Sequence, residues 1–277
     1  MAPFTPILLH ADNPGPLTGD GNNTFLLIGA NGAAVLIDAG QGRPAHLDLL
    51  RQYLGLRQAR LEQVLVTHAH SDHAAGAAAI REAYPHVRFR KQRWPGQDER
   101  FAVDWQSLPD GTSIDLGGDT LVALHTPGHS PDHMAFWHEG SGTLFAGDLV
   151  MATGTVLIEA SRGGDLSAYL ASLTRIQALR PRRVLPAHGP AIDEPDRLLR
   201  RCLQRRRARE AQVLKVLASG PRTVQAMAES IYHGLDPDLM PAAHETVRAH
   251  LEKLRREGRA FVEDDQWSAD GVPVTRE

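Results

Sequence analysis

A cluster of histidines directly behind a short apolar segment constrains this chain more than any other feature of its sequence. Residues 61–67 are rich in valine and leucine and predict a buried strand. The stretch THAHSDH at 67–73 then places four side chains that can bind a metal within six residues. A rigid strand end followed by a tight turn holds such side chains in fixed geometry, as a metal site requires. The alternative is a solvated turn that opens a helix with Asp72 as its N-cap, but such a turn needs none of the three histidines.

Three later apolar segments each lead to one further side chain of this kind. Segments that end at residues 126, 146 and 185 are followed by His129, Asp148 and His188. Each of these residues adjoins a glycine, which lets the backbone and a metal approach closely. Alone, each is typical of a turn. Together with the 67–73 cluster they supply five histidines and two aspartates, the number that two adjacent metals need.

The spacing of apolar residues predicts two sheets sandwiched between helices in the first part of the chain. Apolar runs at 25–29 and 34–38 flank Asn31-Gly32 and predict a β-hairpin. Later strands alternate with helices, which we expect at 44–54, 72–84 and 166–179. Hairpins followed by alternating strands and helices are typical of a layered α/β fold.

The second part predicts a small winged-helix domain. Helical spacing at 198–217, 223–232 and 245–257 is followed by two short strands, at 260–262 and 266–268. Charge supports a boundary near residue 196, because residues 1–196 carry 15 basic and 21 acidic residues, whereas 197–277 carry 15 basic and 12 acidic ones. We therefore expect an α/β domain at 1–196 and a winged-helix domain at 197–277. The positive balance of the second domain permits a polyanionic partner.

Composition excludes several classes of protein. Of the 277 residues, 42% are hydrophobic and 23% charged, which excludes wholesale disorder and fibrous structure. No apolar run approaches the ~18 residues that cross a bilayer, and residues 1–10 lack the features of a signal peptide. We therefore expect a soluble, cytoplasmic protein without a membrane partner. Cys202 is the one cysteine, which excludes an internal disulfide and a thiolate cluster.

The order of the motifs resembles that of the metallo-β-lactamase superfamily. H-x-H-x-D-H is followed by T-P-G-H, then G-D, then A-H-G. The stretches 126–136 (TPGHSPDHMAF), 186–192 (PAHGPAI) and 231–261 are in addition similar to the β-lactamase-like endoribonuclease branch known from mitochondria. The resemblance covers nearly the whole chain. It implies an αββα sandwich with a small C-terminal winged-helix domain.

The resemblance also implies a centre of two metals. The first would be held by His68, His70 and His129, the second by Asp72, His73 and His188, and Asp148 would bridge them. Imidazole and carboxylate ligands suit Zn²⁺, with Mn²⁺ or Fe also acceptable. Two metals ~3.5–4 Å apart can share a hydroxide whose pKa falls from 15.7 towards ~7. We therefore expect a hydrolase with this hydroxide as nucleophile and with Asp72 and Asp148 as catalytic carboxylates.

Several other polar residues allow two interpretations. Asp38 follows a predicted strand and either orients ligand histidines, as in many superfamily members, or belongs to a turn. His133 either contacts substrate or, as we favour, is structural. Asn22 and Asn23 either flank the metals or form a turn. Five more histidines are interpreted as surface or structural residues: His125, His138, His233, His244 and His250.

Seven arginines between residues 197 and 209 also have two interpretations. They could follow a phosphate backbone, or they could form the solvated face of a linker helix, which we favour because runs of like charge are usually solvated. They stand at positions 197, 200, 201, 205, 206, 207 and 209.

Two activities fit this sequence. The first is a phosphodiesterase acting on single-stranded RNA, which rests on the resemblance and on the basic second domain. The second is hydrolysis of a small thioester or ester, of the hydroxyacylglutathione or lactone kind, which rests on the same metal ligands and the acidic first domain. A non-catalytic nucleic-acid-binding protein is disfavoured because no expected ligand is missing. Hydrolysis of β-lactams is disfavoured because we find no export signal.

Overall fold

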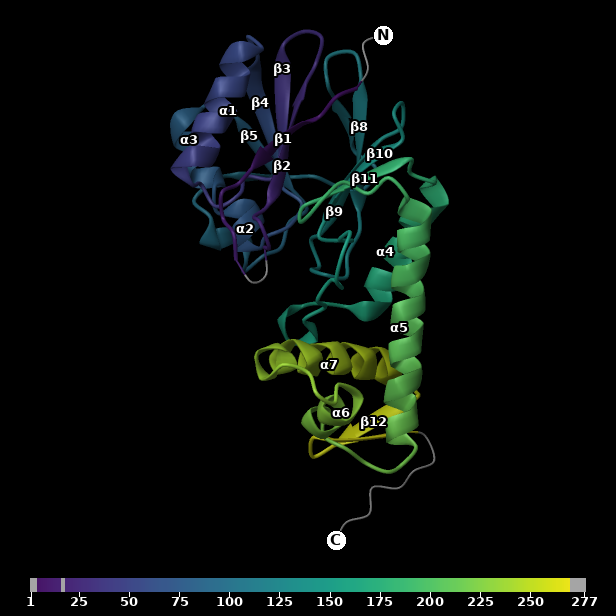
Figure 1. Ribbon diagram of the computed structural model, residues 1–277. Coiled ribbons are helices and arrows are strands. Elements are labelled where there is room, and N and C mark those ends of the chain that lie inside the picture. Colours follow the sequence, from purple (N-terminus) through teal and green to yellow (C-terminus); the bar gives the residue numbers. More distant parts are fainter. Residues whose placement is uncertain (1–3, 16–17, 270–277) are drawn as a thin grey trace.

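Two stacked sheets form the N-terminal part of the protein, shown in Figure 1 as a computed structural model that describes residues 4–15 and 18–269. The first sheet contains, in spatial order, β1 (Ile7–His10), β2 (Asn23–Ile28), β3 (Ala33–Ile37), β4 (Arg60–Leu65), β5 (Arg88–Lys91) and β6 (Trp105–Ser107). Strands β1 to β3 pair antiparallel, and β3 to β6 pair parallel. The hairpin predicted around Asn31-Gly32 is therefore confirmed as β2–β3.

The second sheet is mostly antiparallel. Its spatial order is β11 (Arg183–Pro186), β10 (Thr143–Gly147), β9 (Met134–His138), β8 (Thr120–His125) and β7 (Ser113–Asp115). Only the β10–β11 pair runs parallel among these described strands. Apolar side chains from the facing sides of both sheets, such as Phe25, Leu65 and Phe136, pack between the sheets and bury the centre of the sandwich.

Helices cover the two outer faces. Figure 1 shows α1 (Pro44–Leu56) and α3 (Ala77–Ala83) against the first sheet, and α4 (Leu166–Leu179) and α5 (Pro195–Leu217) beside the second. Helix α4 begins and ends as the sequence predicts, with Asp165 as an N-cap whose carboxylate accepts a hydrogen bond from Ala168 N at 3.0 Å. The αββα sandwich is thereby confirmed.

The helix predicted at 72–84 is broken in the structure. It consists of α2 (Ser71–Ala74) and α3, with Gly76 between them. Gly76 N donates to Gly40 O at 2.8 Å, and a Cβ on Gly76 would lie 2.0 Å from Ala39 O. The loop after β3 therefore presses directly on the backbone at Gly76. This tertiary contact has no signal in the alanine-rich sequence.

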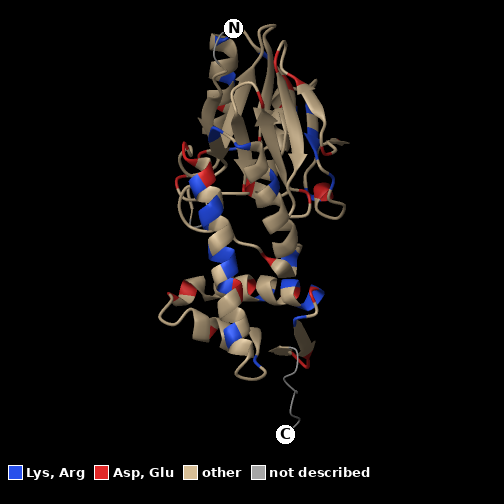
Figure 2. Cartoon of the chain, turned by 90° about the vertical axis from the view of Figure 1, so that its right-hand side faces the viewer, with Lys and Arg blue, Asp and Glu red and all other residues tan. Residues whose placement is uncertain are grey.

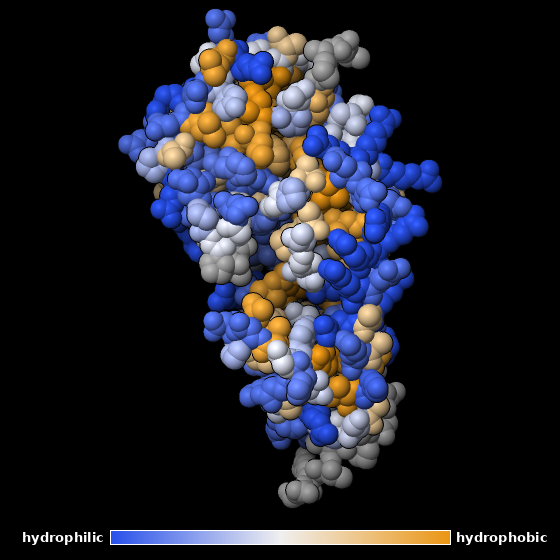
Figure 3. All heavy atoms as spheres, in the orientation of Figure 1, coloured by the Kyte–Doolittle hydropathy of each residue, from blue (hydrophilic) through white to orange (hydrophobic). Residues whose placement is uncertain are grey.

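The C-terminal part is a winged helix, as predicted. It consists of α6 (Val224–Ile231), the short 3₁₀ turn η3 (Pro237–Leu239), α7 (Met240–Arg256), β12 (Ala260–Glu263) and β13 (Gln266–Ala269). These elements share a separate core with the end of α5, including Val213, Met227, Leu251 and Trp267. Figure 3 shows a notch between this domain and the sandwich on the left of the view.

Helix α5 belongs to both parts. Leu198 and Leu199 pack in the core on the outer face of the second sheet, whereas Val213 and Leu217 pack in the winged-helix core. The predicted boundary between residues 196 and 197 falls near the beginning of this helix and stays a prediction. None of the helices in the described ranges is long and apolar enough to span a membrane.

Candidate metal centre

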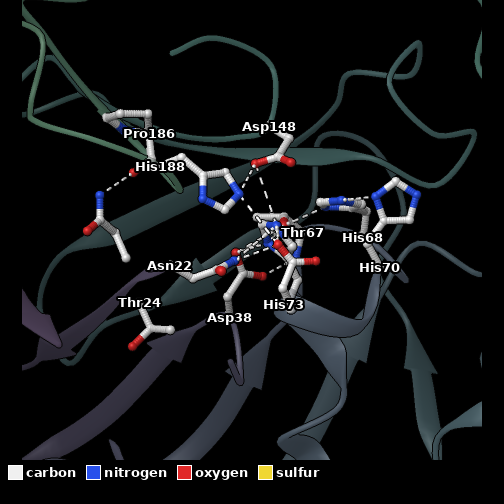
Figure 4. Close-up of polar contacts among 12 residues, drawn as sticks. Asn22, Thr24, Asp38, Thr67, His68, His70, His73, Asp148, Pro186 and His188 are labelled. Carbon is white, nitrogen blue, oxygen red and sulfur yellow. Dashed lines mark hydrogen bonds and ion pairs between the residues drawn. The ribbon is translucent and has the colours of Figure 1, made fainter. Parts of the chain in front are cut away.

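All seven side chains singled out as metal ligands meet at one end of the sandwich. His68, His70, Asp72 and His73 follow β4, His129 follows β8, Asp148 follows β10, and His188 follows β11. Ligands carried at strand ends are held by the hydrogen bonds of the sheets, so their positions are fixed by the fold. Figure 4 shows His68, His70, His73, Asp148 and His188 turned toward one another.

The first group of side chains consists of His68, His70 and His129. His70 Nδ1 lies 2.9 Å from His68 Nε2 and 2.9 Å from His129 Nε2. The remaining nitrogen of His129, Nδ1, donates to Leu157 O at 2.9 Å, so Nε2 carries a lone pair. Three imidazole nitrogens thus converge on one point.

The second group consists of Asp72, His73 and His188. His73 Nε2 lies 3.4 Å from Asp72 Oδ2, and His188 Nε2 lies 3.5 Å from the same oxygen. Asp148 stands between the groups: its Oδ1 is 3.5 Å from His73 Nε2 and 3.3 Å from His188 Nε2, and its Oδ2 is 3.5 Å from His129 Nε2. One carboxylate therefore presents one oxygen to each group.

Asp38 and Thr67 orient the buried histidines from behind. Asp38 accepts hydrogen bonds from Thr67 N (2.7 Å), Thr67 Oγ1 (3.0 Å) and His73 Nδ1 (2.8 Å). Because Nδ1 of His73 donates to Asp38, its Nε2 is left to face Asp72 and Asp148. Asp38 also has a φ of 64°, a backbone conformation that a non-glycine residue rarely adopts. The ligand-orienting interpretation of Asp38 matches this geometry better than a turn.

His133 holds the backbone of Asp148. Its Nε2 accepts from Asp148 N at 3.0 Å, and its Nδ1 lies 2.9 Å from Thr126 Oγ1, to which it donates. Burial lowers the pKa of His133 to about 3, so the neutral form that can accept this bond persists at neutral pH. His133 therefore has the structural role that we favoured. Among the described residues, the possible metal-binding groups include none of the five histidines interpreted as surface or structural.

Asn22 and Asn23 take different positions around the site. Asn22 Nδ2 donates to Asp72 Oδ2 at 3.1 Å, so Asn22 flanks the second group. Asn23 Nδ2 donates to Pro186 O and Gly189 O, and so fixes the loop that carries His188. Asn13 was not expected at the site, yet its Nδ2 donates to Asn22 Oδ1 at 2.7 Å.

A buried ion-pair network behind the His68–His70 loop was also not predicted. Lys91 Nζ, on the last residue of β5, binds both Asp98 Oδ1 (2.5 Å) and Asp132 Oδ2 (2.8 Å). The same Asp132 oxygen accepts from Ala69 N at 2.9 Å. Asp132 thereby fixes the backbone between two ligand histidines.

The charges of the site divide its histidines into two sets. Burial, and then the nearby histidines, lower the pKa of His70 to about 4 and that of His68 well below its usual value. Burial opposes a charge on His188, but the carboxylates of Asp148 and Asp72 outweigh it and raise its pKa to about 9. Burial likewise opposes ionisation of Asp148, yet the charge of His73 holds the pKa of Asp148 well below its usual range. Burial likewise opposes a charge on His73, but Asp72, Asp38 and Asp148 raise its pKa well above its usual value. Without a metal, protons on His73 and His188 offset the charges of Asp72 and Asp148, and a bound cation would take the place of these protons.

These residues fit a pair of metal ions. Thr67 Oγ1 donates to Asp38 and so accepts from His68 Nδ1, which leaves a lone pair on His68 Nε2 as on His129 Nε2. His70 Nδ1 lies 2.9 Å from both of these nitrogens and carries at most one proton, so it can donate squarely to only one of the two lone pairs and leaves the other for a cation. In addition, Asp148 Oδ1 is buried and accepts no hydrogen bond from the described residues, and its contacts of 3.5 and 3.3 Å with His73 and His188 leave it available to a cation.

Lys and Arg recur along α5 (Figure 2), and several of these arginines bind groups of the protein itself. Arg201, Arg205 and Arg206 donate to carbonyls of the loop between β10 and α4. Arg197 forms an ion pair with Glu194, and Arg200 forms one with Asp196. Five of the seven arginines are exposed, as the interpretation of a solvated helix face predicts, whereas Arg206 is buried and Arg209 half-buried.

Comparison with known families agrees with this geometry. Residues 17–188 match the metallo-beta-lactamase superfamily, which is more than half of the chain. The chain belongs to this superfamily. Residues 223–267 match the beta-lactamase associated winged helix domain. The resemblance inferred from the motifs is thus confirmed for both domains. This metallo-β-lactamase-fold protein is a hydrolase, and its superfamily typically binds two divalent metals.

Two similar proteins of known name cover most of the chain. A beta-lactamase-like protein 2 homolog from Caenorhabditis elegans is 30% identical over 262 residues, which is 92% of this chain and 84% of that protein. An atrochrysone carboxyl ACP thioesterase from Aspergillus fumigatus is 32% identical over 244 residues, which is 82% of this chain and 73% of that protein.

Solved structures share the fold and, in one case, hold metal. A beta-lactamase domain protein from Burkholderia ambifaria superimposes with a TM-score of 0.80 at 23% identity, over 95% of this chain and 90% of that one. A protein crystallised in a di-iron-bound form superimposes with a TM-score of 0.56 at 30% identity, over 72% of this chain and 98% of that one.

Proposed function

We propose that this metallo-β-lactamase-fold protein hydrolyses an acyl thioester at a centre of two divalent metals, with Zn²⁺ as the favoured ion. One metal would be held by His68, His70 and His129, the other by Asp72, His73 and His188, with Asp148 shared between them. Metals bound there would supply a hydroxide nucleophile at neutral pH and neutralise charge that develops on the carbonyl oxygen of the substrate. Ligands without sulfur, all imidazole or carboxylate, suit Zn²⁺ and also admit Mn²⁺ or Fe.

The side chains of this chain define where a substrate approaches. His68 and His73 are fully buried, whereas the side chains of Asp72 and Asp148 are 19% and 14% exposed. Solvent and substrate therefore reach the site past the two aspartates and past His129, whose side chain is 11% exposed. Asp38 and Leu157 keep the ring nitrogens of His73 and His129 turned toward that opening.

The hydrogen bonds that the α5 arginines form within the protein favour a thioester over a polyanion as the substrate. Arg206 is buried on Val156 O, and the exposed Arg201 and Arg205 each use a donor on a backbone carbonyl, which leaves these arginines fewer donors for phosphates. The 1–196 segment is also net acidic, which disfavours a polyanionic substrate. A relative named as a carboxyl ACP thioesterase supports the same choice.

A parallel assay tests the substrate class. The metal-loaded protein is offered acyl-coenzyme A and acyl-N-acetylcysteamine thioesters and, separately, end-labelled single-stranded RNA. We expect the wild type to hydrolyse thioesters. Asp148→Ala should lose this activity and also lose bound metal, whose content is measured by plasma mass spectrometry. Metal analysis of the protein as purified tests the assignment of Zn²⁺. Cleavage of RNA without thioester turnover contradicts the proposal.

Cleavage of single-stranded RNA is the second candidate. The winged-helix domain favours it, because winged helices often bind nucleic acid. Residues 223–267 match the model of such a domain. Arg207 is exposed and forms no hydrogen bond or ion pair in the described ranges, so it is free to bind a phosphate. An RNA-cleaving enzyme would lose affinity steeply with salt, by about 0.7 log units per log unit of salt for each phosphate neutralised.

A further inference from the structure

An irregular segment at residues 151–159 lies directly against the metal centre. It contains no helix or strand, yet its Leu157 O accepts the hydrogen bond from His129 Nδ1 at 2.9 Å. The flanking side chains of Val156 and Ile158 are buried. Because such a segment has no neighbouring strand to bind its carbonyls, its position depends on other partners.

Helix α5 supplies those partners. Arg201 Nη2 donates to Ala152 O (3.3 Å), Arg205 Nη1 donates to Gly154 O (2.8 Å), and Arg206 Nη2 donates to Val156 O. The carbonyls of Val156 and Leu157 are consecutive. The first therefore binds the helix and the second binds His129.

Arg206 differs from the other two arginines because it is buried. It is 4% exposed, and in the described residues it forms no ion pair with a carboxylate. Its guanidinium lies 5.2 Å from the centre of the Tyr169 ring, and Tyr169 Oη donates to Leu149 O at 3.0 Å, next to Asp148. A buried guanidinium without a carboxylate is costly unless its donors are satisfied. Breaking its hydrogen bond to Val156 O would therefore leave a buried charged donor without a partner.

The winged helix reinforces the same region through α7. Glu245 Oε2 accepts from Ser161 N at 3.0 Å, two residues beyond the 151–159 segment. Arg256 forms a two-pronged ion pair with Asp165, whose N donates to Gly128 O at 2.8 Å. Gly128 directly precedes His129, so both sides of this histidine are braced from the C-terminal part of the chain.

We propose that Arg206, supported by Arg201 and Arg205, is a positioning residue for the metal centre. By binding the carbonyls of the 151–159 segment, these arginines hold Leu157 O in place and so keep His129 Nε2 aimed at His70. The long helix thereby makes the geometry of the first metal-binding group depend on the C-terminal domain. This inference rests on the proposed metal ligands.

Metal binding by Arg206→Met tests the inference, with Arg207→Met as the matched control. Methionine keeps the apolar stem of Arg206 but removes its donors, whereas Arg207 is exposed on the same helix and has no partner among residues 4–15 and 18–269. Each variant is titrated with Co²⁺, whose visible spectrum reports the ligand geometry at each ion. We expect one of the two ions to bind about 10- to 100-fold more weakly in Arg206→Met, with an altered spectrum. Arg207→Met should match the wild type, and Arg206→Lys should partly restore binding.

The outcomes separate this inference from the proposed function. If the wild type binds no metal, both are overturned. If the wild type binds two ions and Arg206→Met binds them with the same spectrum and affinity, the inference alone is overturned. If Arg206→Met does not fold, the exposed double variant Arg201→Gln/Arg205→Gln decides in its place. Weakened binding of one ion supports the inference, and wild-type binding overturns it.

Discussion

Lys91 and Asp132 form an ion pair that is fully buried, with 2.8 Å between Nζ and Oδ2 and 0% exposure of both side chains. The three donors of the ammonium are all used, since Nζ also binds Asp98 Oδ1 and Gln92 O. Asp132 is satisfied in turn by Ala69 N and by Ser130 Oγ. Two segments that flank the metal ligands are thereby tied to the end of β5. Such complete satisfaction is what makes a buried charge tolerable.

Replacing Lys91 by methionine should destabilise the protein strongly. The variant leaves the carboxylate of Asp132 buried without a counter-ion, a change that typically costs about 3–5 kcal/mol. Chemical denaturation of both proteins measures the loss. Arg88→Met, at an exposed position of the same strand, should stay within about 0.5 kcal/mol of the wild type. Equal stability of Lys91→Met and Arg88→Met would show that the ion pair contributes nothing.

Gly128→Ala should disrupt the loop that carries His129. Gly128 has a φ of 141°, and a Cβ there would lie 2.3 Å from the Cα of Tyr169 on α4. Overpacking of this kind, added to backbone strain, should cost about 2–5 kcal/mol in the free energy of unfolding and weaken metal binding. Gly189→Ala is the control, because its φ of 80° carries similar strain but no atom lies within 4 Å of the added Cβ. If the two variants were equally stable, contact with α4 would not be the cause.

The residues that could be predicted from the sequence are those whose position follows from a strand end. His129, Asp148 and His188 each come directly after a short apolar run, and the second sheet brings the carboxyl ends of β8, β10 and β11 to one edge. The network of Lys91 and Asp132 could not be predicted in this way. Its partners are far apart in the sequence, and only the packing of loops against the first sheet makes them neighbours.

Short strands and long-range contacts explain the other differences. Strands β1, β6 and β7 were not expected from the sequence, because three or four residues carry little periodicity. The arginines of α5 were assigned to solvent or to phosphate because a run of like charge gives no sign of the backbone carbonyls that it meets. The hydrogen bond from His129 to Leu157 O could not be predicted for the same reason, since every residue has a backbone carbonyl and the sequence does not indicate which one is used.

Chelation should remove the metals reversibly while the fold survives. The ligands stand on the ends of strands in a sandwich with its own buried cores, so folding does not depend on the ions as it does in small zinc domains. We expect the apo-protein to keep a cooperative thermal transition at a lower temperature, because ions that bind only the folded state stabilise it. Calorimetry before and after chelation, and again after metal is restored, measures this. Loss of the cooperative transition in the apo-protein would mean that the metals are structural.

Stability should fall as the pH decreases from about 6.5 towards 4, in part because of His46. This residue of α1 is fully buried, and its Nε2 donates to Thr24 Oγ1 at 2.8 Å, since the threonine hydroxyl itself donates to Leu9 O. Its Nδ1 has no partner, so protonation would bury an unpaired charge, and burial lowers the pKa of His46 to about 4.

The sign of the effect follows from proton binding. Between pH 6.5 and 4 the unfolded chain binds a proton at His46 and the folded protein does not, so the free energy of unfolding decreases with falling pH, by at most about 1.4 kcal/mol per pH unit for this group. Above pH 6.5 the contribution is constant. In His46→Gln this dependence is removed, so the stability of the variant relative to the wild type should rise as the pH is lowered from 7.5 to 5. Urea denaturation at several pH values measures the difference, and His10→Gln, at an exposed position, serves as the control for replacing a histidine by glutamine. A constant difference between His46→Gln and the wild type across this range would mean that His46 titrates alike in the folded and unfolded protein.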